Sequence, residues 1–223
     1  MDAKQSHKKM AAEVLQFIDQ NDNFLLSAHI NADGDAIASV IAMALLLEKR
    51  NKKAEMIFHD QSIDSRFNYL KYFKNIRSYN QEMEKNYEAA IILDVPGLKR
   101  LGDVANLLPP RSNVAKIDHH PVEGDFAICN MVDEHASSTT QLIYEILELS
   151  GIPVDVDLAN AIYTGIVYDT GRFSFSNTTS RDMYIGGYMI EIGIDPAQIN
   201  NRIFFENSYL FPKYGDLSKS RFT

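Results

Sequence analysis

Short clusters of Asp and His residues stand out in this sequence, because carboxylates and imidazoles can bind metal ions and transfer protons. The first cluster is the stretch 29–35, which contains His29 and the carboxylates of Asp33 and Asp35 on either side of Gly34. A Gly between two Asp residues lets the backbone turn sharply, so that both carboxylates can reach one point. Two carboxylates repel each other unless a positive charge lies between them. A divalent metal ion is the simplest candidate for that charge.

Two more clusters each follow a short run of apolar residues. The run 89–93 leads directly into Asp94, and the run 113–117 leads into an Asp-His-His triplet at 118–120. Burying an Asp at the tip of such a strand is costly unless a cation or hydrogen-bond donors compensate its charge. One Asp at a strand end is ordinary, but three strand ends that carry such residues indicate a shared ligand.

A further candidate, Asp169, lies just beyond a predicted helix that covers residues 158–167. A carboxylate at the carboxyl end of a helix opposes the helix dipole, so it needs another reason to be there. We therefore interpret Asp169 as an additional metal ligand.

The elements that must position these clusters are predicted from the spacing of apolar residues. Stretches rich in apolar residues predict strands at 24–28, 54–58, 89–93 and 113–117, and the run 89–93, which is apolar throughout, is typical of a buried parallel strand. Helical spacing and capping residues predict helices at 10–18, 36–47, 98–107, 137–149, 158–167 and 178–192, with a short aromatic helical stretch at 67–73. Alternation of residue types predicts a short strand at 172–176.

This order of elements favours an α/β fold. We expect a mostly parallel, Rossmann-like sheet with helices on both faces. In such folds ligands bind in the crevice outside the carboxyl ends of the strands, which is where the Asp and His clusters are predicted to lie.

The composition narrows the range of partners. With 223 residues, 45% of them hydrophobic, the chain can bury one sizeable core. No apolar run is long enough for a membrane span and no signal-peptide core follows the polar amino terminus, so we expect a cytoplasmic protein without a membrane partner. The net charge of −8 argues against duplex DNA as a partner. The single cysteine, Cys129, excludes an internal disulfide framework and a thiolate zinc cluster within one chain.

The candidate ligands together indicate which metal ions the chain binds and which reaction it catalyses. They are four carboxylates and two imidazoles, namely His29, Asp33, Asp35, Asp94, His119 and Asp169. Two octahedral divalent ions that share one bridging carboxylate fit this inventory, and oxygen-rich ligation with some nitrogen favours manganese or magnesium over zinc or copper. Two metal ions roughly 3.5–4 Å apart stabilise the attacking and leaving oxygens of a phosphoryl group. The sequence therefore predicts hydrolysis of a phosphoester or a phosphoanhydride.

The same motifs resemble those of the DHH phosphoesterases, a family named for the Asp-His-His triplet seen here at 118–120. The resemblance extends to the first motif at 29–35, the second at Asp94 and the fourth at 169–171, and it covers roughly residues 24–193. Within the family the chain looks most like the nanoRNases, the branch of oligoribonucleases and phosphoadenosine-phosphate phosphatases, rather than the long RecJ exonucleases.

The resemblance implies a role for each residue of the motifs. One metal ion would be held by His29, Asp33 and Asp94, and the other by Asp35, Asp94, His119 and Asp169, with Asp94 as the bridge. By the same analogy the catalytic residues would be His120, beside the scissile phosphate, and Asp118, which would orient the two histidines. Arg172 directly follows the fourth motif and is a candidate for binding the substrate phosphate, the alternative being an ordinary surface arginine.

The expected function is that of a two-metal phosphoesterase. Its substrates would be short single-stranded oligonucleotides such as pApA-type dinucleotides, or the small nucleotide 3′-phosphoadenosine 5′-phosphate, and its ions Mn²⁺, with Mg²⁺ as the alternative. Two other functions stay open. The chain could be an inorganic pyrophosphatase or polyphosphatase with the same metal core, or a nucleotide-binding module without turnover.

The last part of the chain departs from the family pattern. We expect residues 1–195 to form the DHH catalytic domain and residues 196–223 to be a linker or tail. Members of this branch usually continue into a second, substrate-binding domain called DHHA1, and nothing after about residue 193 resembles it. Apolar surface around Phe204, Phe205 and Phe211 could instead drive self-association into a homodimer.

Overall fold

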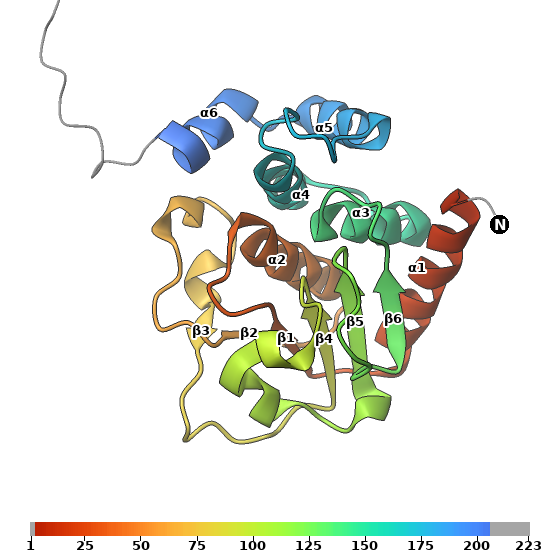
Figure 1. Ribbon diagram of the computed structural model, residues 1–223, viewed down its shortest axis with the longest axis vertical. Coiled ribbons are helices and arrows are strands. Elements are labelled where there is room, and N and C mark those ends of the chain that lie inside the picture. The colour runs from red at the N-terminus through yellow and green to blue at the C-terminus, as the bar shows by residue number, and fades with distance from the viewer. Residues whose placement is uncertain (1–2, 206–223) are drawn as a thin grey trace, which may run out of the picture.

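The computed structural model describes residues 3–205 and contains one parallel sheet at its centre (Figure 1). Its six strands are adjacent in the order β3-β2-β1-β4-β5-β6, and every pair is parallel. The strands are β1 (Phe24–Ser27), β2 (Ala54–Phe58), β3 (Arg77–Ser78), β4 (Ala89–Leu93), β5 (Val114–Asp118) and β6 (Cys129–Val132). Because all strands run the same way, their carboxyl ends meet at one edge of the sheet. The α/β fold with a parallel sheet is thereby confirmed.

The two faces of the sheet are covered differently. The α-helices are α1 (Ala3–Gln20), α2 (Gly34–Lys49), α3 (Thr139–Ser150), α4 (Val156–Asp169), α5 (Ser180–Ile192) and α6 (Pro196–Asn200). Figure 1 shows α2 and α3 next to the sheet, with α4 and α5 in a layer farther out. The opposite face is covered by the 3₁₀ helix Leu98–Leu107, whose Leu101 and Val104 pack with Ala90 and Ile92 of β4.

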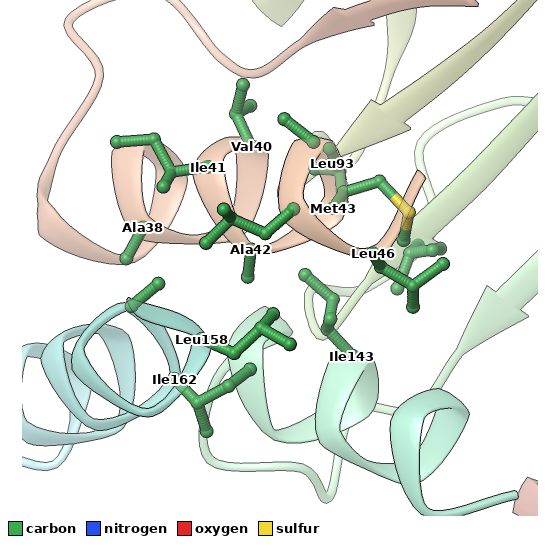
Figure 2. Close-up of a cluster of buried hydrophobic side chains, with 14 of the residues drawn as sticks. Ala38, Val40, Ile41, Ala42, Met43, Leu46, Leu93, Ile143, Leu158 and Ile162 are labelled. Carbon is green, nitrogen blue, oxygen red and sulfur yellow. The ribbon is translucent and has the colours of Figure 1, made fainter. Parts of the chain in front are cut away.

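Helix α2 is the centre of the larger core. All residues from 34 to 47 are buried, as expected for a helix that is apolar on every side. Figure 2 shows Ala38 and Ala42 on the side of α2 that faces Leu158 and Ile162 of α4. These short side chains let the two helices approach closely, so α2 is packed between the sheet and α4. The amino end of α2, which carries part of the first motif, is therefore held rigidly.

Most predicted elements are confirmed, and the exceptions have local causes. The predicted helix 98–107 is a 3₁₀ segment with a reversal at Gly102, whose φ of 62° does not fit a continuous helix. The predicted strand 172–176 is wrong: Arg172 and Phe173 both have positive φ, and the amides of Ser174 and Phe175 turn back to the carbonyl of Thr170. The stretch 67–73 forms turns between two short 3₁₀ helices, Ser65–Phe67 and Phe73–Asn75.

Strands β3 and β6 were not expected from the sequence. β3 has only two residues, and β6 alternates between half-buried, exposed and buried positions without an apolar run. Cys129, at the start of β6, is a half-buried free thiol that packs against the core.

Residues 196–205 pack onto the same body as the preceding elements. Helix α6 is followed by a π-helical turn, Asn201–Phe205, and Ile199 and Ile203 are buried in the larger core. The expected domain boundary at residue 195 stays a prediction, and Phe211 lies outside the described residues. Among the described helices none is both long enough and apolar enough to cross a membrane.

Candidate metal centre

The six predicted metal ligands lie together at the carboxyl edge of the sheet. Two groups of potential ligand atoms, each within 4.8 Å of one another, contain all six residues. We call the first group, His29, Asp33 and Asp94, the outer set. We call the second group, Asp35, His119 and Asp169, the inner set. A third group of the same kind brings His120 together with Asp94 and His119.

The loop between β1 and α2 supplies ligands to both sets. Asp33 is the N-cap of α2, where its Oδ1 accepts hydrogen bonds from the amides of Asp35 and Ala36, both at 3.1 Å. The left-handed residue that turns the loop is Asn31, with a φ of 55°, and not Gly34. Gly34 is required for space, because a Cβ at this position would overlap the ring of Tyr168.

Asp35 is completely buried and strongly hydrogen bonded. Its carboxylate accepts bonds from the amide of Thr139 at 2.6 Å, the amide of Thr140 at 3.2 Å and the hydroxyl of Thr140 at 2.8 Å. These donors are the first turn of α3, so the inner set is tied to a helix amino terminus. Burial, together with the nearby carboxylates of Asp169 and Asp94, raises the pKa of Asp35 well above its usual range. A cation at this point would reverse that effect and favour the ionised carboxylate.

Asp94 lies between the two sets. Its Oδ2 is 3.4 Å from Nε2 of His29, and its Oδ1 is 3.5 Å from Nε2 of His119. The side chain is held by the hydroxyl of Thr139, which donates to Oδ1 at 3.0 Å. Since its two oxygens face different histidines, Asp94 is arranged as a carboxylate that can bridge two ions.

In the metal-free chain the histidines balance the charge of the carboxylates. Burial lowers the pKa of His29, but hydrogen bonds to Asp33 and Asp94 outweigh it and raise the pKa to about 10. Burial also lowers the pKa of His119, but its interactions with Asp169 and Asp94 outweigh this effect and raise the pKa to about 11. Although burial raises the pKa of Asp94, the two histidines hold it below its usual range. The site therefore attracts positive charge.

The orientation of both imidazoles fits a metal ion. Nδ1 of His29 lies 2.9 Å from the carbonyl of Ile30, and Nδ1 of His119 lies 3.3 Å from the carbonyl of Ala136. Each contact places the ring hydrogen on Nδ1 and turns Nε2 toward the carboxylates, which is the usual arrangement of metal-binding histidines. Among the described residues, the buried Nε2 of His119 has no hydrogen-bond partner, although Oδ2 of Asp169 lies 3.1 Å away. A nitrogen left unpaired between carboxylates is suited to a divalent cation.

His120 is held by a chain of polar groups that starts inside the sheet. Its Nδ1 lies 2.8 Å from Oδ1 of Asp118, and the other oxygen of Asp118 lies 3.2 Å from Nζ of Lys116. Lys116 also donates to the carbonyl of Pro96 at 2.8 Å. Asp118 and Lys116 are almost completely buried, whereas the side chain of His120 is 40% exposed. His120 is thus the member of the triplet that a substrate can reach.

Lys116 was not predicted as part of the site. The signal was present, because a lysine within an otherwise apolar strand is rarely buried without a charged partner. Asp60 was also missed: its carboxylate accepts the amides of Asn31 and Ala32, at 2.8 and 3.2 Å, and so holds the loop of the first motif. Its only sequence signal is its position two residues after β2.

Arg172 packs against two aromatic side chains near the end of the described residues. Its guanidinium carbon lies 5.1 Å from the ring centroids of both Phe204 and Phe205. Another arginine, Arg100, contacts a predicted ligand, with Nη2 at 3.5 Å from Nδ1 of His29. Binding of the substrate phosphate by Arg172 stays a prediction.

Comparison with known proteins identifies the family of the chain and its relatives. The model of the DHH family, N-terminal domain, matches residues 23–166. The bifunctional oligoribonuclease and PAP phosphatase NrnA of Thermus thermophilus is 24% identical over 209 residues, which cover 94% of this chain and 61% of that protein. The protein of the same name from Bacillus subtilis is 28% identical over 200 residues, covering 87% of this chain and 61% of the relative. The chain thus spans about three fifths of the length of these relatives.

Two solved structures share the fold at low sequence identity. An exopolyphosphatase-related protein from Bacteroides fragilis superposes with a TM-score of 0.81 at 22% identity, over 90% of this chain and 60% of the other. A putative family II inorganic pyrophosphatase from Methanococcus jannaschii gives a TM-score of 0.61 at 19% identity, over 80% of this chain and 61% of the other.

Proposed function

The chain belongs to the DHH family, and we propose that it is a two-metal phosphoesterase that hydrolyses short oligonucleotides, 3′-phosphoadenosine 5′-phosphate, or both, with Mn²⁺ as its preferred ion. The names of the Thermus thermophilus and Bacillus subtilis relatives state both activities. The observation that carries the proposal is the position of Asp94, whose two oxygens face the histidines of two different ligand sets.

We assign the metal ligands from these contacts. The outer set would hold one ion through His29, Asp33 and Asp94, and the inner set the second, together with Asp94 as the shared carboxylate. When bound, two divalent ions lower the pKa of an attacking water and neutralise the charge that develops on the phosphoryl group. The chain's own task is to bring six ligands of the right kind together at one edge of the sheet.

His120 would act on the substrate directly. Asp118 accepts the hydrogen on Nδ1 of this histidine, so that the protonated imidazole can donate a hydrogen bond or a proton from Nε2 to the substrate phosphate. Lys116 in turn fixes Asp118 from within the sheet. This buried support keeps an exposed imidazole in one orientation.

The test is hydrolysis by the purified chain of a pApA-type dinucleotide and of 3′-phosphoadenosine 5′-phosphate, first with Mn²⁺ and then with a chelator. We expect product only with the metal ion, and a loss of more than about 100-fold in the Asp94→Ala variant, because even residues that merely support metal ligands cost 10 to 100-fold when removed. The variant Asp103→Ala, which loses an exposed carboxylate outside the ligand sets, serves as the control. Turnover by Asp94→Ala at the parent rate would contradict the proposal.

A second candidate is an inorganic pyrophosphatase. It is favoured by the shared fold of the Methanococcus jannaschii structure, whose name states that activity as putative. A substrate panel that includes pyrophosphate and polyphosphate separates the two functions. If pyrophosphate is hydrolysed far faster than either nucleotide, the pyrophosphatase assignment replaces the first.

A further inference from the structure

We propose that Phe204, Phe205 and Arg172 form a flat, cationic platform on which the nucleobase of the substrate stacks. This inference rests on the proposed function, because it assigns the base contact of the same site. The platform would bind one end of a nucleotide while the metal centre binds the phosphate at the other end.

The platform is connected to the metal centre through Tyr168. The ring of Tyr168 packs so closely on Gly34 that a Cβ there would overlap it. Gly34 separates the carboxylates of Asp33 and Asp35, and Tyr168 itself directly precedes Asp169. The ring of Tyr168 therefore lies against the loop that carries Asp33 and Asp35.

Planar groups continue outward from Tyr168. The ring of Phe204 stacks on it, with centroids 6.3 Å apart and an interplanar angle of 21°. The guanidinium carbon of Arg172 lies 5.1 Å from the centroids of both Phe204 and Phe205. Arg172 can take this position because successive positive φ angles at Gly171, Arg172 and Phe173 turn the backbone directly after α4. The result is a continuous series of planar groups that begins at Tyr168, beside Gly34.

The segment that carries the two phenylalanines is anchored. Nη1 of Arg66 donates to the carbonyl of Ile203 at 2.6 Å, and Arg66 is itself held by Asp64 through Nε and Nη2 at 2.8 and 2.6 Å. The side chain of Ile203 is fully buried. Phe204 is half-buried, whereas Phe205 is 58% exposed. A fixed backbone thus presents an open aromatic ring.

A nucleobase suits this surface better than other small ligands. Bases stack on aromatic rings and on arginine planes, and every base has a face that can do so. The positive charge of Arg172 also complements the phosphates of a nucleotide, in a chain whose net charge is −8. Since the platform offers stacking rather than a pattern of hydrogen bonds, we expect it to discriminate weakly among bases and to prefer purines for their larger area.

The chain contains no tryptophan, which makes a direct test possible. In Phe205→Trp the single indole should be quenched saturably by AMP in Mg²⁺ buffer, and neither ribose 5-phosphate nor pyrophosphate, which lack a base, should have this effect. The matched control is Phe175→Trp, because Phe175 is 60% exposed and its ring packs against Gly171. Equal quenching in both variants, or none in Phe205→Trp, would overturn the proposal.

Kinetics give a second readout. Phe205→Ala should raise KM for a dinucleotide roughly tenfold with kcat nearly unchanged, while Phe205→Tyr retains the parent KM and Phe175→Ala behaves like the parent. A fall in kcat at constant KM would contradict a role in base binding.

The two proposals can fail separately. If calorimetry shows that the parent chain binds AMP and that Phe205→Ala weakens this binding, but the parent hydrolyses neither a dinucleotide nor 3′-phosphoadenosine 5′-phosphate, the proposed function alone is refuted. If the parent hydrolyses these substrates and Phe205→Ala changes neither KM nor AMP binding, the platform alone is refuted.

Discussion

The outer and inner ligand sets contain the same residue types, yet they are built into the molecule differently. In the outer set, Asp33 is 38% exposed and belongs to a loop. In the inner set, Asp35 is completely buried and receives three hydrogen bonds from the start of α3. The difference teaches that Asp35 is part of the core, whereas Asp33 completes the outer set at the surface. We therefore expect the inner site to be preformed and the outer site to depend more on the ion itself.

Asp94 should show the largest effect, because its carboxylate is placed between the two sets. In Asp94→Asn both ions lose a charged ligand, so we expect the bound metal, measured by mass spectrometry, to fall from two ions per chain toward none. Hydrolysis should fall by more than about 100-fold. In Asp33→Asn, by contrast, the inner ion should remain. If the two variants retained the same metal content, the division into two sets would be wrong.

The difference between the inner and outer sets can also be tested without measuring catalysis, through the free energy of unfolding of the chain in the absence of metal ions. Asp35→Ala leaves two buried amides and a hydroxyl without an acceptor, which should lower the free energy of unfolding by about 2–4 kcal/mol. Asp33→Ala removes the N-cap of α2 and a long, partly exposed contact with His29, at about 1 kcal/mol. Urea denaturation in the presence of a chelator measures both. If both variants lost the same free energy of unfolding, the inner set would not be built into the core more firmly than the outer set.

Gly34 lies between the two sets and tests how tightly they are packed. Gly34→Ala should cost about 1–3 kcal/mol, because the added methyl group overlaps the ring of Tyr168. The matched control is Gly187→Ala in α5, where nothing lies within 4 Å of the new Cβ, and it should be neutral or stabilise the chain by up to about 1 kcal/mol. Thermal unfolding measures the stability of both variants. If Gly34→Ala were as stable as the parent chain, the ring of Tyr168 would be able to move away from the loop.

The convergence of the ligands could be predicted because it depends on strong local signals. Asp94 follows an unbroken apolar strand and His119 a mostly apolar one, and parallel strands necessarily bring their carboxyl ends to one edge. His29 precedes a helix whose apolar residues are unmistakable. A strand end and a helix start are enough to place these side chains near one another without any knowledge of distances.

The partners of the supporting residues could not be predicted, because these contacts join distant segments of the chain. Asp60 holds a loop that precedes it by 28 residues or more, and Lys116 reaches Pro96 on the neighbouring segment. The stacking of Arg172 requires two positive φ angles in succession, which the alternating pattern at 172–176 conceals. Such interactions follow from the assembled fold and not from residue spacing.

The smallest effect should come from Thr140, which touches the inner set without binding metal. Its hydroxyl donates to Oδ1 of Asp35 at 2.8 Å, next to the bond from its own amide. Thr140→Val removes the hydroxyl at nearly constant volume, so the inner ion should bind about tenfold more weakly, while Thr140→Ser should restore the affinity. Calorimetric titration with Mn²⁺ resolves the two binding steps, and only the inner step should change. If Thr140→Val weakened only the outer binding step, the hydroxyl would act on the loop of Asp33. The assignment of Thr140 to the inner site would then be wrong.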